Sequence, residues 1–121
     1  MPKIMIVDDE PDLREMIDLM IRKQGYETQT AFNGEDFLNK IEVFNPDLVT
    51  LDVMMPGLTT KEILEKLNQR NLHPKIILLT VVRFSETEKE NVRKMGNIVN
   101  YMTKPFEFKE LIEQIDYYLN Q

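Results

Sequence analysis

The chain has 121 residues, no cysteine and a net charge of −6 at neutral pH, and 42% of its residues are hydrophobic. This length and composition predict one globular domain over residues 1–121, and they exclude a disulfide framework or a thiolate metal site. The acidic balance disfavours direct binding of nucleic acid. No apolar run is long enough to predict a membrane span, and the lack of cysteine suits the cytoplasm.

The chain begins with an apolar strand, Lys3–Val7, that stops at the acidic triplet 8–10. Pro11 then takes the first position of a helix, after an acidic cap, where its missing N–H costs nothing. The helix is expected to end at residues 24–25 and to carry its apolar side chains at helical spacing. These apolar residues are Leu13, Met16, Ile17, Met20 and Ile21.

A second strand over 26–31, a turn over 32–34 and a second helix follow. The apolar residues of that helix are Phe37, Leu38 and Ile41. An Asn-Pro pair at 45–46 ends the helix, because a residue that precedes proline avoids helical geometry. The third strand, over 48–51, is apolar enough to be buried on both faces, and it runs directly into Asp52.

A third helix, capped by Thr59 or Thr60, leads to the fourth strand, Lys75–Thr80. The next helix, over 85–95 and ended by a glycine, is polar with a thin apolar stripe. A fifth strand over 98–102 and a last amphipathic helix complete the order. Strands that alternate with helices, several of them apolar throughout, predict a doubly wound α/β domain with a parallel sheet.

Polar side chains follow the carboxyl ends of four expected strands. Asp8 and Asp9 follow the first strand, Asp52 follows the third, Thr80 ends the fourth, and Lys104 follows the fifth. In a doubly wound sheet these strand ends face one crevice, where ligands bind. We therefore expect three carboxylates, one hydroxyl and one ammonium group to converge, although the sequence scatters them over most of its length.

Clustered carboxylates repel one another, by roughly 4 kcal/mol for two charges about 4 Å apart at an effective dielectric of about 20. An all-oxygen site offsets this repulsion by binding Mg²⁺, and the lack of cysteine or a nearby histidine argues against zinc. Such an ion beside Lys104 and Thr80 suggests chemistry on a phosphate, with Asp52 as the nucleophile. Taken singly, the same residues have plainer interpretations: a helix-capping acidic cluster, a strand-end hydroxyl and a solvated lysine.

Four motifs stand at these strand ends. They are Ile-Val-Asp-Asp-Glu at 6–10, Leu-Asp-Val-Met-Met-Pro-Gly at 51–57, Leu-Thr at 79–80 and Thr-Lys-Pro-Phe at 103–106. In combination they resemble the receiver domain of two-component response regulators, the family of the chemotaxis regulator CheY, over essentially the whole chain. The resemblance implies a flavodoxin-like sheet of five parallel strands in the order 2-1-3-4-5, with helices on both faces.

The resemblance also implies a metal site for Mg²⁺ around Asp52, the phospho-acceptor. Asp9 is implied to ligate the ion directly, and Asp8 mainly through water. Met54 is implied to contribute its backbone carbonyl. The residues named are those that stand at the matching motif positions of this sequence.

Further roles follow from the same resemblance. Lys104 is implied to contact the phosphoryl group, aimed by a cis peptide bond to Pro105, while Thr80 and Tyr101 correspond to the family's switch pair. The sequence departs from the usual pattern at three places. These are Thr59-Thr60 in place of a frequent Asp-Gly, Val81 where a small residue is usual, and a segment over 96–101 that is one residue longer.

The resulting expectation is a signalling receiver that takes a phosphoryl group onto Asp52 from a sensor histidine kinase or a phosphotransfer protein. The surface formed by the fourth helix, fifth strand and fifth helix then changes its affinity for a target protein or output domain. Such a domain catalyses its own phosphorylation and dephosphorylation rather than turning over a separate substrate.

A Mg²⁺-dependent phosphatase with an aspartyl nucleophile is the main alternative. Such an enzyme normally has a second carboxylate two residues after the nucleophile, where this chain has Met54. A pseudo-receiver that is never phosphorylated is disfavoured because every site residue is kept. His73, in a loop before proline, is expected to face solvent. Met54 and Val82 are both apolar, and we expect them to slow hydrolysis of the phosphorylated state.

Overall fold

The computed structural model describes residues 1–81, 85–94 and 98–120. Strands and helices alternate along these residues: β1 (Lys3–Val7), α1 (Pro11–Arg22), β2 (Glu27–Ala31), α2 (Gly34–Phe44), β3 (Leu48–Asp52), α3 (Thr60–Gln69), β4 (Lys75–Thr80), α4 (Glu86–Arg93), β5 (Ile98–Thr103) and α5 (Phe108–Leu119). The strands form one parallel sheet in the order β2-β1-β3-β4-β5, which confirms the predicted doubly wound fold. No helix among the described residues is long and apolar enough to cross a membrane.

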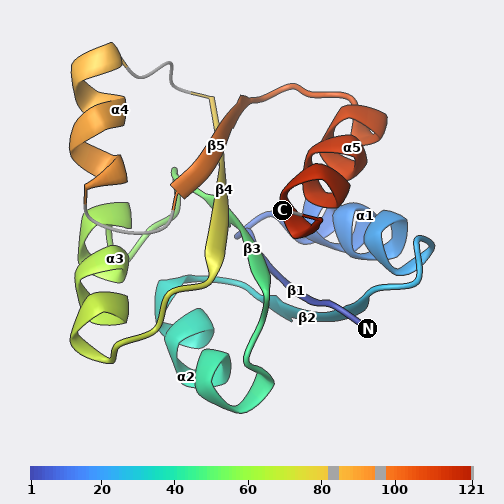
Figure 1. Ribbon diagram of the computed structural model, residues 1–121, viewed down its shortest axis with the longest axis horizontal. Helices are drawn as coiled ribbons and strands as arrows, with labels where there is room; N and C mark the ends of the chain where they lie inside the picture. Colours follow the sequence, from blue (N-terminus) through green and yellow to red (C-terminus); the bar gives the residue numbers. More distant parts are fainter. Residues whose placement is uncertain (82–84, 95–97, 121) are drawn as a thin grey trace.

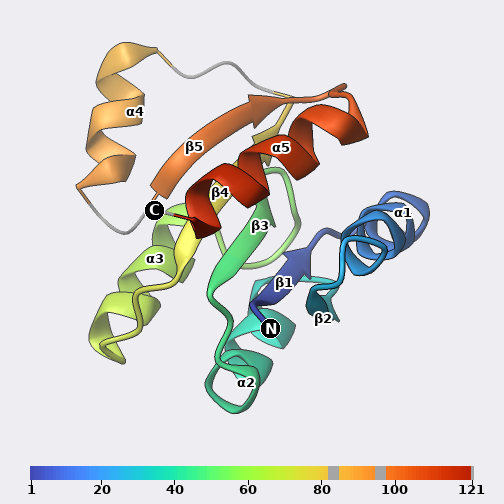
Figure 2. The ribbon, with the colours of Figure 1, turned by 45° about the vertical axis from the view of Figure 1, so that its right-hand side comes forward.

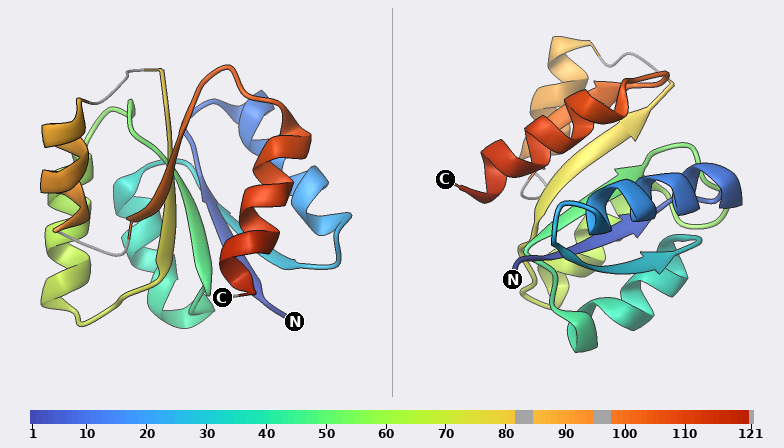
Figure 3. Two further views of the ribbon diagram at one scale, coloured as in Figure 1. Left: turned by 45° about the horizontal axis from the view of Figure 1, so that its top comes forward. Right: turned by 90° about the vertical axis from the view of Figure 1, so that its right-hand side faces the viewer.

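The helices cover both faces of the sheet. Figure 1 shows α1 and α5 on one face and α2, α3 and α4 on the other, and Figure 3 shows the same three layers from two further sides. Two apolar clusters fill the spaces between the layers, one centred on Phe37 and the other on Ile17 and Ile115. Because β1, β3 and β4 lie between these clusters, their side chains are buried on both faces, as their apolar sequences predict.

Helix α1 begins at Pro11 as predicted but ends at Arg22, two residues before the expected end. Ile17 and Ile21 are buried against the sheet. Met16, which we expected on the apolar side, has 51% of its surface exposed. Neighbouring residues of a helix point about 100° apart, so Met16 lies at the border of the apolar face instead of under it.

Of the two predicted caps of α3, Thr59 and Thr60, Thr59 occupies the N-cap position. Its hydroxyl accepts a hydrogen bond from the Glu62 N–H at 3.1 Å, and the Glu62 carboxylate accepts one from the Thr59 N–H at 3.1 Å. These bonds lower the pKa of Glu62. The next helix, α4, occupies less than the predicted 85–95, and Gly96, its expected end, lies outside the described residues.

A β-bulge in β5 accommodates the extra residue noted in the sequence. The pairing of β4 with β5 passes from Ile76 opposite Ile98 to Ile77 opposite Asn100. Val99 is therefore the additional residue of this strand. After the bulge, Tyr101 lies opposite Leu78, so Tyr101 and Thr80 belong to the same face of the sheet.

Candidate functional site

Three carboxylates meet at the carboxyl edge of the sheet. Strands β1 and β3 are neighbours, so Asp8 and Asp9, which follow β1, lie beside Asp52, the last residue of β3. One carboxylate oxygen from each residue lies within 4.8 Å of the others. Asp8 is 1% exposed and Asp52 is 4% exposed, whereas Asp9 lies nearer the surface. The sequence predicted this convergence, and the parallel topology produces it.

Lys104 spans two of these carboxylates. Its Nζ lies 3.0 Å from Asp8 Oδ2 and 3.4 Å from Asp52 Oδ1, and 13% of its side chain is exposed. The Lys104 N–H donates to the Thr80 carbonyl at 2.7 Å, which fixes the end of β5 against β4. The peptide bond between Lys104 and Pro105 is cis. Lys104 is thus a largely buried counter-ion, and the solvated-lysine interpretation is wrong.

The site has less positive charge than its carboxylates require for neutrality. Burial and the neighbouring Asp8 charge raise the pKa of Asp52, although Lys104 and the Met54 N–H partly oppose them. Burial lowers the pKa of Lys104, but the carboxylates of Asp8 and Asp52 outweigh burial and raise it overall. One ammonium thus faces three carboxylates. An all-oxygen cluster with this deficit fits a hard divalent cation such as Mg²⁺.

Tyr101 connects β5 to α4. Its hydroxyl donates to the Lys89 carbonyl at 2.8 Å, and the Lys89 and Arg93 side chains approach its ring at 5.7 and 5.6 Å. Burial raises the pKa of this phenol. Figure 2 shows β5 at the sheet edge with α4 and α5 beside it, and Thr80, 2% exposed, ends the adjacent strand.

The acidic cap predicted for α1 is corrected by the structure. Glu10 occupies the N-cap position, but its side chain makes no capping hydrogen bond. The Asp8 carboxylate does not replace this bond: its Oδ1 accepts a hydrogen bond from the N–H of Glu10 itself at 3.0 Å, in the loop before the helix. Arg14, which no motif marked, donates from Nη1 to the Asp8 carbonyl at 2.9 Å. A backbone carbonyl has no sequence signature, so a partner of this kind leaves no pattern to find.

Exposed apolar residues follow three strands at the edge of the sheet that carries the carboxylate cluster. Phe32, Met54 and Val81, which follow or lie near the ends of β2, β3 and β4, are each more than half exposed. Beside Lys104 lies a hollow of about 350 Å³ with a largely apolar lining. Val82, the second apolar position noted in the sequence, lies outside the described residues. Met54 offers no carboxylate, which disfavours the phosphatase alternative.

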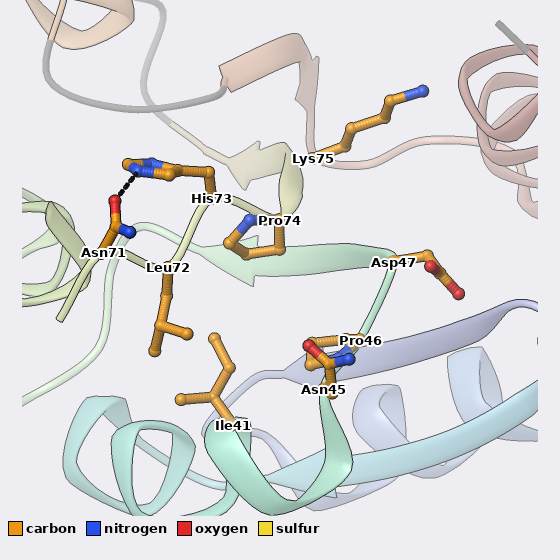
Figure 4. Close-up of a pocket in the computed structure, with 9 residues that line it drawn as sticks. All are labelled: Ile41, Asn45, Pro46, Asp47, Asn71, Leu72, His73, Pro74 and Lys75. Carbon is orange, nitrogen blue, oxygen red and sulfur yellow. Dashed lines mark hydrogen bonds between the residues drawn. The ribbon is translucent and has the colours of Figure 1, made fainter.

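A second pocket lies at the opposite end of the sheet. It has a volume of about 330 Å³ and lies between the α2–β3 and α3–β4 loops (Figure 4). His73 is exposed there, as predicted, and its Nε2 lies 3.0 Å from Asn71 Oδ1. None of the strand-end polar residues lines this pocket, so it is separate from the carboxylate cluster.

The fold of the chain has counterparts among known proteins. The profile of the response regulator receiver domain matches residues 4–116. The chain belongs to this family. The family match, the CheY-like sheet order and the motifs of the site agree with one another, so the resemblance drawn from the sequence is confirmed.

Individual relatives of this receiver domain are moderately similar in sequence. The chain is 38% identical over 109 residues to the alkaline phosphatase synthesis transcriptional regulatory protein PhoP of Bacillus subtilis, covering 90% of this chain but 45% of PhoP. The receiver domain of Francisella response regulator 1452 is 30% identical, with a TM-score of 0.86 and full coverage of both chains. The response regulator TrrA of Thermotoga maritima, solved in complex with Mg²⁺ and BeF, is 37% identical, with a TM-score of 0.79 and coverage of 97% and 98%.

Proposed function

We propose that this receiver domain accepts a phosphoryl group on Asp52 from a phosphohistidine of a kinase or phosphotransfer protein, and that Mg²⁺ is its cofactor. The observation that carries the proposal is the arrangement at the carboxyl edge of the sheet. The Asp52 carboxylate is buried beside Asp8, and one lysine ammonium reaches both. The TrrA structure, which contains Mg²⁺ and BeF, supports the same chemistry for a related chain.

The residues of the site have distinct tasks in this proposal. Asp8, Asp9 and the Met54 carbonyl would hold the ion together with Asp52. When bound, Mg²⁺ supplies positive charge that offsets the carboxylates and the incoming phosphoryl oxygens. The Met54 N–H donates to Asp52 Oδ1 at 3.2 Å, which orients the carboxylate with its other oxygen, Oδ2, left for in-line attack on phosphorus. Lys104 then transfers its contact from Asp8 to the new phosphoryl oxygens.

The proposed conformational switch depends on a difference between α4 and α5, the two helices beside β5. Helix α5 is anchored to the rest of the domain, whereas α4 is held less firmly. Helix α5 is tied to the body by hydrogen bonds from Tyr26 to Asp116 and from Asn100 to Gln114. Every described side chain of α4 is exposed or half-buried, and Tyr101 bonds directly to its backbone. When Thr80 turns toward the phosphoryl group, Tyr101 moves with it, and the surface of α4, β5 and α5 changes its affinity for a partner.

The partners we propose are a sensor histidine kinase or phosphotransfer protein, and a downstream target protein or output domain, all in the cytoplasm. The similarity to PhoP, a transcriptional regulatory protein more than twice the length matched here, supports an output of the regulatory class. We propose no direct nucleic-acid contact for residues 1–121, because their net charge is −6.

Intact-mass measurement tests the function. Incubation with acetyl phosphate and Mg²⁺ should add one phosphoryl group per chain, and hydroxylamine should remove it because acyl phosphates are labile to this nucleophile. Omitting Mg²⁺ should prevent the addition. A chain that gains no phosphoryl group, or one that releases many phosphates per molecule from a phosphomonoester, would contradict the receiver function and in the second case favour a phosphatase.

Lys104→Ala should separate phosphorylation from switching. We expect the variant to retain part of its phosphoryl uptake, because in-line attack depends on Asp52 and the metal, but to lose phosphorylation-dependent partner binding. The ammonium that reports the new charge is absent. Binding titrations with the beryllofluoride-treated protein measure the effect, with Lys23→Ala, at the exposed C-cap of α1 and outside the α4-β5-α5 surface, as the matched control. Full activation of Lys104→Ala would refute this role.

The lifetime of the phosphorylated state should depend on Met54. Its side chain is 58% exposed. We expect it to cover part of the path of an attacking water, which it cannot orient by a hydrogen bond. Met54→Asn combined with Val82→Glu should therefore speed dephosphorylation at least several-fold without a large change in Mg²⁺ affinity. Decay of labelled phosphoprotein is the measurement, and Met16→Asn on α1 is the control. Equal decay in the wild type and the double variant would exclude polarity at these positions as the determinant.

A further inference from the structure

Arg14 holds a backbone carbonyl of the loop that carries two of the site's carboxylates. Arg22 lies 3.1 Å from the Asp18 carboxylate, and Arg70, which donates from Nη1 to the Leu38 carbonyl at 2.7 Å, also lies 3.7 Å from the Glu42 carboxylate. Arg14, half-buried in the first turns of α1, directs Nη1 to the backbone carbonyl of Asp8 at 2.9 Å. Among the described residues, no carboxylate lies within ion-pair distance of it.

The bond from Arg14 closes the loop that carries Asp9. This loop has no side-chain cap from Glu10. The Asp8 N–H donates to the Ala31 carbonyl at 3.2 Å at the start of the loop, and two further bonds of Asp8 hold the loop itself. The Asp8 carboxylate accepts from the Glu10 N–H, and the Asp8 carbonyl accepts from Arg14. The Asp8 carbonyl belongs to the peptide unit between Asp8 and Asp9, so the bond from Arg14 fixes the orientation of this peptide, and that orientation directs the Asp9 carboxylate.

We propose that Arg14 is a positioning residue for the metal site. By holding the Asp8 carbonyl, it orients the Asp8–Asp9 peptide so that the Asp9 carboxylate faces the oxygens of Asp8 and Asp52. Arg14 itself touches neither the ion nor the phosphoryl group. The inference rests on the proposed function, because it assumes that the carboxylate cluster binds Mg²⁺.

Charge and geometry predict opposite effects of removing this arginine. A guanidinium close to the cluster repels a divalent cation, so if Arg14 acted through charge alone, neutralising it would tighten Mg²⁺ binding. If Arg14 positions the loop, its removal frees the Asp9 carboxylate and weakens binding. Groups that orient metal ligands from outside the coordination sphere typically contribute about 10- to 100-fold to affinity, which is large enough to exceed the charge effect.

Calorimetric titration of Mg²⁺ into the folded protein measures this difference. Arg14→Met keeps the aliphatic stem and removes the donor and the charge, and we expect it to weaken Mg²⁺ binding roughly 10-fold. Arg14→Lys keeps the positive charge but replaces the guanidinium fork by one ammonium group, and it should lose an intermediate part of the Mg²⁺ affinity. Arg22→Met, which removes an exposed pair with Asp18 on the same helix, should change the affinity less than about two-fold.

Two further measurements separate positioning from stability and from the function itself. Without Mg²⁺, the melting temperature of Arg14→Met should lie close to that of Arg22→Met, while the amide resonances of Asp9 and Glu10 should shift only in Arg14→Met. Unchanged or tighter Mg²⁺ binding in both Arg14 variants would overturn the inference while leaving the proposed function intact. If the wild type bound no Mg²⁺, the proposed function would fail, and the inference with it.

Discussion

Replacing Asp52 by asparagine is expected to abolish phosphoryl uptake. Asparagine has nearly the same shape as aspartate, but its amide is a poor nucleophile and cannot form an acyl phosphate. The other two carboxylates of the cluster should not substitute for it. Asp8 is 1% exposed, and its oxygens accept from Lys104 and the Glu10 N–H, while Asp9 lies on the loop before α1 and not at the end of β3.

Phosphate-affinity gels of wild type and Asp52→Asn after treatment with acetyl phosphate and Mg²⁺ provide the measurement. Asp12→Asn is the matched control, because Asp12 is an exposed aspartate in the first turn of α1, four residues from Asp8. Its uptake should equal that of the wild type. A shifted band that survives in Asp52→Asn would move the phosphorylation site to another residue.

Mg²⁺ is expected to raise the melting temperature of the unphosphorylated protein. At about 100 times its dissociation constant, a ligand that binds only the folded state adds about 2.7 kcal/mol to the free energy of unfolding. The physical source is the repulsion among Asp8, Asp9 and Asp52, which one lysine offsets only in part. Thermal melts with and without Mg²⁺ at constant ionic strength measure the rise, and Asp9→Ala should largely lose it. An equal rise in Asp9→Ala would exclude the cluster as the binding site.

The same repulsion predicts how Asp52→Asn behaves without metal. Folding raises the pKa of Asp52, chiefly through burial and then through Asp8, so the ionised carboxylate destabilises the folded state at neutral pH. Asp52→Asn should therefore melt above the wild type at pH 7. The difference should begin to shrink as the pH falls through the raised pKa and should vanish below the ordinary pKa of aspartate, because the carboxyl is then neutral in both the folded and the unfolded wild type. A wild type more stable than Asp52→Asn at pH 7 would show that Lys104 outweighs this penalty.

Much of the architecture could be predicted because its signals are local. The apolar runs of β1, β3 and β4, Pro11 at the start of α1 and a threonine cap at 59 or 60 are all properties of short segments. Alternation of strands with helices then leaves few topologies, and parallel strands in such a fold direct their carboxyl ends to one edge. The meeting of Asp8, Asp9 and Asp52 follows from that rule without any knowledge of coordinates.

The sequence-based predictions that were wrong or incomplete concern features that depend on contacts with residues distant in the chain. The spacing of Met16 predicts a place on the apolar face, yet the rotation of α1 on the sheet leaves half of its surface exposed. The extra residue before Tyr101 was visible as a length difference. Only pairing with β4 shows that it forms a bulge at Val99, which keeps Tyr101 and Thr80 on the same face.

The sequence by itself determined which chemical groups are available and at which strand ends they stand: three carboxylates, one hydroxyl and one ammonium. The tertiary structure decided how those groups are paired. Lys104 bridges Asp8 and Asp52 across 96 and 52 residues of chain, and Arg14 binds a backbone carbonyl instead of a side chain. Charges attract whichever partner the fold brings within a few ångströms, and backbone carbonyls are the same at every residue, so neither pairing leaves a pattern in the sequence.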